Sequence, residues 1–175
     1  MNNKIDLKFL LAVALVILSI ASRFLPLPPN FSPIMAVALF SGVIFADRKI
    51  AMIVPIAAMF ISDIVIGLHP TMLAVYLSFA IIALLGMRMK SINAKNVVGN
   101  SLLAAVIFFV VTNLGVFAAG WYSYTLEGLT TCFTMAIPFF RATLASSVLY
   151  SGILFGGVYL AEKFAFTATA PAIEK

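Results

Sequence analysis

Three strongly polar residues, Asp63, Asn113 and Arg141, lie inside otherwise apolar segments of this chain. An ionisable side chain within hydrocarbon costs about 2.5–3.5 kcal/mol on insertion scales, so such groups persist only where they pair with each other or contact something polar. All three are expected at a similar depth, together with Tyr76. We therefore predict a polar site in which Asp63 and Arg141 form a charge pair, either to bind a ligand or to hold two helices together.

These residue types do not form a recognisable catalytic set. A lone intramembrane aspartate lacks the second carboxylate that an acid–base pair of carboxyl groups requires. The chain has one histidine, His69, and one cysteine, Cys132, which are too few for a metal site built from protein ligands. We therefore expect a protein that is not an enzyme and that holds no cofactor and no metal. The alternative is a single protein ligand to a metal that an organic cofactor already holds.

The composition is that of an integral membrane protein. The 175 residues are 63% hydrophobic and only 10% charged, with a mean hydropathy of +1.15, whereas soluble domains are about 25% charged. The basic residues behind the pI of 9.6 are spread over short loops. That distribution favours contact with anionic lipid headgroups over nucleic acid. Membrane lipids are thus an expected partner, and nucleic acid is not.

A membrane-spanning helix needs about 20 mostly apolar residues. The last apolar stretch, 129–160, is too long for one crossing, and Pro138 is expected to break it because proline removes a backbone donor and clashes with the preceding turn. Residues 129–137 are therefore predicted to form a short interfacial or re-entrant piece. The predicted fold is an all-α bundle of six transmembrane helices in a single membrane domain, 1–175, with helices at about 5–22, 33–46, 50–67, 71–87, 97–119 and 138–160.

The distribution of Lys and Arg predicts the orientation, because cytoplasmic loops are enriched in both. With both termini inside, the outer loops receive only Arg23, while the inner side receives Lys4, Lys8, Arg48, Lys49, Arg88, Lys90, Lys95, Lys163 and Lys175. A multi-pass protein of a bacterial cytoplasmic membrane is expected. As an alternative, Met1–Ala21 has the basic start and apolar core of a cleavable signal peptide.

The outer connections suggest a cavity. Residues 25–32 are proline-rich and apolar, and the segment that follows them, 33–46, is short for a membrane crossing. Non-helical backbone at membrane depth is tolerated where protein buries it or where it lines a cavity, and short, interrupted spans point to a transporter's binding site. The alternative is an ordinary surface loop that is apolar. Trp121 and its aromatic neighbours form either an interfacial belt or a platform for a ligand.

Several motifs resemble those of an uncharacterised family of small bacterial membrane proteins, which is itself similar to the substrate-binding S components of energy-coupling factor (ECF) vitamin transporters. The motifs are Arg23-Phe-Leu-Pro-Leu-Pro-Pro-Asn-Phe-Ser-Pro33, Ser62-Asp63 with Gly67 and His69, Val75-Tyr76, Thr112-Asn113, and Ala136-Ile-Pro-Phe-Phe-Arg141.

This resemblance implies an S-component-like fold whose outer loops and helix ends bind a vitamin or cofactor precursor. It also implies an ECF-type ATPase and coupling module as a possible partner. S components usually have an Ala-x-x-x-Ala pattern on the first helix for docking to that module, and Ala12, Ala14 and Ala21 do not give this spacing. A transporter that works alone is therefore the alternative.

The sequence thus favours an uptake protein for a small organic solute bound at the outer face. Asp63 and Arg141 would supply complementary charge, and Trp121 would cover an apolar part of the solute. The full predicted substrate-binding set is Asn30, Asp63, His69, Tyr76, Asn113, Trp121 and Arg141. The alternative is a structural or assembly protein that transports nothing and has a purely structural Asp63–Arg141 pair.

Overall fold

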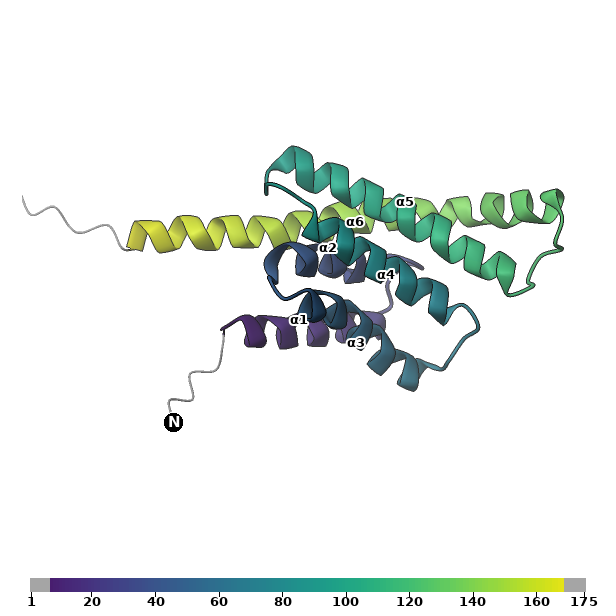
Figure 1. Cartoon of the computed structure of the whole chain (residues 1–175), viewed down its shortest axis with the longest axis horizontal. Helices are drawn as coiled ribbons and strands as arrows, with labels where there is room; N and C mark the ends of the chain where they lie inside the picture. Colours follow the sequence, from purple (N-terminus) through teal and green to yellow (C-terminus); the bar gives the residue numbers. More distant parts are fainter. Residues whose placement is uncertain (1–6, 169–175) are drawn as a thin grey trace, which may run out of the picture.

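The computed structural model describes residues 7–168 and is all-helical over that range, without a strand (Figure 1). Three of its helices are long and apolar enough to cross a membrane: α3, α5 and α6 as far as Leu160. These three helices indicate a membrane protein. The six helices are α1 (Leu7–Arg23), α2 (Ile34–Ile44), α3 (Arg48–Ile66), α4 (Met72–Met87), α5 (Ala94–Ala118) and α6 (Leu126–Ala168).

The first five helices closely match the predicted segments because their ends are encoded locally. Asp47 precedes α3 and its side chain accepts a hydrogen bond from Lys49 N–H at 2.7 Å. Asn93 caps α5 in the same way, accepting from Asn96 N–H at 2.9 Å. Short polar side chains at this position satisfy backbone donors that the first helical turn leaves free. Gly67, with φ of 118°, ends α3 in a backbone conformation that favours glycine.

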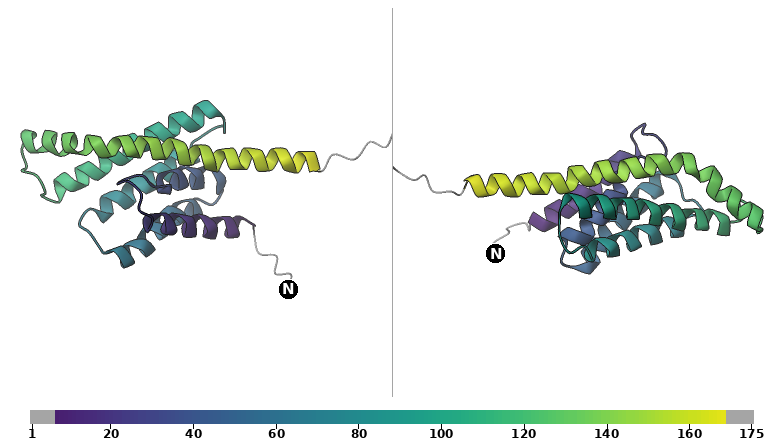
Figure 2. Two further views of the ribbon diagram at one scale, coloured as in Figure 1. Left: turned by 180° about the vertical axis from the view of Figure 1, so that it is seen from behind. Right: turned by 90° about the horizontal axis from the view of Figure 1, so that it is seen from above.

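The sixth helix differs from the prediction. Residues 129–137 do not form a separate interfacial or re-entrant piece, because α6 runs without interruption through Pro138. Figure 2 shows that α6 instead bends within its green, N-terminal part, the part that contains Pro138. A proline inside a helix removes one hydrogen bond, and a bend can accommodate its ring without ending the helix. The 43 residues of α6 span about 65 Å at 1.5 Å per residue, about twice the thickness of a bilayer core.

Helix α2 forms the centre of the bundle. Every residue from Ile34 to Gly42 is buried, and α2 contacts each of the other five helices. Its Phe40 ring packs edge-on against Phe155 of α6, with the ring centroids 5.1 Å apart. Such a helix is apolar on all sides, as expected of a helix surrounded by others.

Two glycines allow α2 and α4 to lie very close together. A Cβ added at Gly42 would collide with the carbonyl oxygen of Ala83, and one added at Gly86 would collide with that of Leu39. Small residues at helix contacts let backbones approach closely in membrane proteins. In contrast, a Cβ added at Gly152 on α6 would meet nothing within 4 Å.

Successive helices run in alternating directions, so the connections at 24–33, 67–71 and 119–125 share one end of the bundle (Figure 1). We call this the site end. Figure 1 shows the α3–α4 and α5–α6 connections on the right, opposite the described ends of the chain. The connections at 45–47 and 88–93 belong to the opposite end.

We predict that Gly86→Ala destabilises the protein, because its methyl group must displace the α2 backbone, and overpacking of this kind costs about 1–3 kcal/mol. Gly152→Ala is the matched control. Its methyl group meets open space, and alanine is favoured over glycine inside a helix. Thermal unfolding of both variants in detergent should show a lowered midpoint for Gly86→Ala alone. Equal midpoints in the two variants would contradict the close α2–α4 contact.

Candidate functional site

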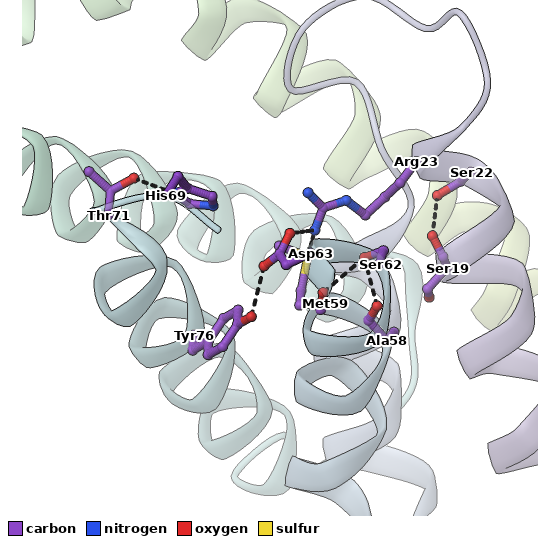
Figure 3. Close-up of polar contacts among 10 residues, drawn as sticks. All are labelled: Ser19, Ser22, Arg23, Ala58, Met59, Ser62, Asp63, His69, Thr71 and Tyr76. Carbon is purple, nitrogen blue, oxygen red and sulfur yellow. Dashed lines mark hydrogen bonds and ion pairs between the residues drawn. The ribbon is translucent and has the colours of Figure 1, made fainter. Parts of the chain in front are cut away.

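A wholly buried carboxylate lies at the site end. The side chain of Asp63 has no exposed area, and its Oδ1 is 2.7 Å from Nη1 of Arg23, whose side chain is 17% exposed. The contact has the distance of an ion pair but not the direction of a hydrogen bond. The other carboxylate oxygen, Oδ2, accepts a hydrogen bond from the Tyr76 hydroxyl at 2.7 Å (Figure 3).

Three helices position this group. Arg23 is the last residue of α1, Asp63 lies in the last turn of α3, and Tyr76 lies in the second turn of α4. The two charged residues meet because α1 packs against α3. At this contact the side chains are small: Ser19 and Ser22 of α1 and Ser62 of α3 are buried. Arg23 Nη1 also donates to Met59 Sδ at 2.8 Å, which further fixes the guanidinium over α3.

The partner of Asp63 is therefore Arg23, and the predicted Asp63–Arg141 pair does not form. The reason lies in the packing, because α6 does not contact α3. Arg141 is exposed, and within the described part of the chain it makes no ion pair or hydrogen bond. The pairing of Asp63 with Arg141 is predicted from their similar depth in the membrane. Depth alone does not determine which helices are neighbours.

A cavity of about 450 Å³ opens beside Arg23 at the site end. The proline-rich connection at 24–33 forms one wall, and residues of α1 to α5 and of the 67–71 connection complete the lining. The connection itself is held against α6, because Ser146 Oγ donates to the Asn30 carbonyl at 3.3 Å and the Phe31 ring packs edge-on against Tyr150. The lining is mainly apolar and includes Leu25, Phe31, Met35, Met59, Phe79 and Phe108.

A second cavity, of about 210 Å³, adjoins the first. The two share Asn30, Val75 and Phe108 as lining residues. Asn30 has a φ of 62°, a left-handed conformation that asparagine tolerates better than most residues. The second cavity extends towards α6 and includes Asn113, whose side-chain amide donates to the Phe109 carbonyl at 2.7 Å.

The predicted site residues thus fall into three groups. Asn30 and His69 line the larger cavity and Asn113 lines the smaller one. Asp63 and Tyr76 line neither: Asp63 pairs with Arg23, which lines the larger cavity, and Tyr76 donates a hydrogen bond to Asp63. Trp121 is 65% exposed on the 119–125 connection and, like Arg141, lines neither cavity.

Arg23 is the functional candidate that the predicted set omits. A signal for it was present in the sequence, because Arg23 is the only basic residue in the predicted outer loops and directly precedes the proline-rich segment. Among the described residues that line the larger cavity, it also supplies the only guanidinium. Chemically, the arrangement offers hydrogen-bond donors beside an apolar hollow, which suits the binding of a ligand. Within residues 7–168, no group of three or more His, Cys, Asp and Glu side chains could hold a metal ion.

We predict that removing either charge alone destabilises the fold more than removing both. Arg23→Gln leaves a buried carboxylate without its cation, and breaking a buried pair in this way costs about 3–5 kcal/mol. The double variant Arg23→Gln/Asp63→Asn contains no unpaired charge and should recover most of that loss. Thermal unfolding of the single and double variants in detergent measures the coupling. Strictly additive losses would show that the two side chains do not interact.

Comparison with known proteins gives one match. No curated protein and no solved structure matches the chain. Over residues 3–170 the sequence matches a family of unknown function, DUF6580. Because the match extends over nearly the whole sequence, this membrane protein belongs to the DUF6580 family.

Proposed function

We propose that this protein is an uptake protein of the S-component type, which binds a small organic solute at the outer face of a bacterial cytoplasmic membrane. In this proposal all six helices cross or enter the bilayer, both termini are cytoplasmic, and the site end faces outwards. The single observation on which the proposal rests is the cavity of about 450 Å³ beneath the proline-rich connection.

Three properties of that cavity support solute binding. Its volume lies within the range of about 300–1,000 Å³ that is typical of small-molecule sites. Its walls are mainly apolar with a few polar groups, which is the usual balance for recognising an organic molecule. One wall is non-helical chain, and in a membrane protein such backbone is tolerated where it is buried or lines a cavity.

The helix lengths are consistent with the same proposal. Helix α2 has only 11 residues, about 16 Å, so it cannot cross a bilayer core of about 30 Å by itself. In this proposal the non-helical connection at 24–33 covers the rest of the distance between α2 and the outer surface of the bilayer. Interrupted spans of this kind favour a binding site near the break.

The proposed uptake is either driven by an ECF-type ATPase and coupling module or carried out by the protein alone. The first helix lacks the Ala-x-x-x-Ala spacing that favours the module, so we favour a transporter that works alone.

A structural role without transport is the second candidate. It is favoured by the complete burial of Asp63, which does not itself line the cavity. In that case the ion pair serves only to join α1 to α3, and the cavity binds no small molecule. The two candidates differ in whether a small molecule occupies the cavity, and this can be measured directly.

We predict that Val75→Trp abolishes solute binding, because Val75 lines both cavities and an indole would occupy the space. Leu77→Trp is the matched control, since Leu77 is on the same helix but 55% exposed and lines neither cavity. Protein purified gently from cells should release a small molecule, detected by mass spectrometry, from wild type and Leu77→Trp only. Cells that produce these two proteins should also accumulate that molecule. Release of the same compound in equal amount from Val75→Trp would refute the site.

We also predict that the site end is extracellular. In a Cys132→Ala background, Ser123→Cys places a thiol on the 119–125 connection, and Lys90→Cys places one at the opposite end of the bundle; both positions are exposed. A membrane-impermeant maleimide added to intact cells should label Ser123→Cys alone, and opening the cells should allow Lys90→Cys to react. Labelling of Lys90→Cys in intact cells would mean that the cavity faces the cytoplasm and cannot collect a solute from outside.

A further inference from the structure

The guanidinium of Arg23 is only partly used by the protein. Its Nη1 atom contacts both Asp63 and Met59. Figure 3 shows the other terminal nitrogen pointing away from Asp63, and within residues 7–168 neither it nor Nε has a protein partner. A guanidinium has five N–H donors in a planar fork. One edge of Arg23 therefore stays available to a ligand while the other edge remains attached to α3.

The cavity exposes the cation of the pair and conceals the anion. Arg23 lines the cavity, whereas Asp63 has no exposed area and lies behind it. Among the described residues that line this cavity, none is acidic. A ligand that enters therefore meets a guanidinium edge and no carboxylate, which favours an anion over a cation.

His69 adds a second donor to the lining of the same cavity. Its Nδ1 is 2.9 Å from the Thr71 hydroxyl oxygen. When that hydroxyl donates to Nδ1, the ring proton is on Nε2, which is then a donor. Figure 3 shows Thr71 beyond the histidine ring as seen from Arg23, and both Arg23 and His69 line the cavity. The amide of Asn30, which also lines the cavity, is a further donor.

The remainder of the cavity suits an apolar body that contains a ring. Phe31, Phe79 and Phe108 provide aromatic walls, and Leu25 and Met35 are aliphatic neighbours. Arg23 is the one arginine or lysine among the described residues that line this cavity, so the lining compensates the single charge of a carboxylate better than the double charge of a phosphate. A single carboxylate matches the planar fork of one arginine, which binds such groups through two parallel hydrogen bonds.

We propose that the cavity binds a carboxylate-bearing solute with an apolar, ring-containing body, and that the free guanidinium edge of Arg23 holds the carboxylate with His69 as a second donor. This proposal rests on the proposed function and specifies the substrate class. Asp63 and Tyr76 are positioning residues, because they fix Arg23 from behind and do not touch the solute.

The test compares acids with their uncharged and cationic counterparts. The probes are 2-naphthoate with 2-naphthamide, and indole-3-acetate with indole-3-acetamide and tryptamine, each titrated into the purified full-length protein in detergent at neutral pH. In wild type the acids should bind about 10- to 100-fold more tightly than their amides, which is the range expected of a charge-assisted hydrogen-bonded contact. Val75→Trp should bind none of them.

The variants separate binding from folding. Arg23→Gln/Asp63→Asn removes the guanidinium without leaving a buried charge, so it should fold, retain weak binding of the amides, and lose the preference for acids. Arg23→Lys keeps the charge but loses the planar fork, and it should bind the acids more weakly than wild type. Arg88→Gln removes an exposed arginine at the opposite end of α4 and should keep the full preference.

Three results would overturn the inference: amides or tryptamine that bind wild type as tightly as the acids, an acid preference that persists in the folded double variant, or no binding by any probe.

Uptake by cells is measured separately. Acids that bind in the cavity but are not accumulated would refute the proposed function and leave the carboxylate site intact. Uptake of a neutral or cationic solute would support the proposed function and refute the carboxylate site.

Discussion

The burial of the Asp63 carboxylate is the constraint on which the rest of the site depends. A carboxylate without exposed area is costly unless a cation and hydrogen bonds compensate for its lost hydration. Arg23 supplies the cation and Tyr76 the hydrogen bond, and each comes from a different helix. The Asp63 carboxylate on α3 therefore helps to determine where α1 and α4 pack against α3. A small shift of any of these helices would leave that group uncompensated.

The same interaction determines where the proline-rich connection begins. Arg23 is both the end of α1 and the start of the segment that closes the larger cavity. With Arg23 held on α3 and Asn30 held on α6 through Ser146, the connection is fixed at two points, and both of these residues line the cavity. Its prolines restrict the backbone between those points. The cavity is thus a consequence of how the chain is anchored, and its polar wall contains the residue that anchors it.

Packing inside the bundle contributes to the shape of the cavity at the site end. Gly42 and Gly86 allow α2 and α4 to touch through their backbones. The residues from Ile34 to Gly42 are buried. Towards the site end α2 is replaced by non-helical chain, and the larger side chains of α4 and α5, such as Phe79 and Phe108, line the space that remains.

The sequence by itself determined the membrane class, the all-helical architecture and the positions of the first five helices, because apolar length, capping residues and glycines act over a few neighbouring residues. It also placed Asn30 and His69 near a hollow, since connections at one end of an alternating bundle must lie together. Only the tertiary structure decided that Asp63 pairs with Arg23 and not with Arg141, and that α6 continues through Pro138. Both depend on contacts between segments distant in sequence. Charge and depth are properties of single segments, whereas the neighbours of a helix depend on how the other five helices pack around α2.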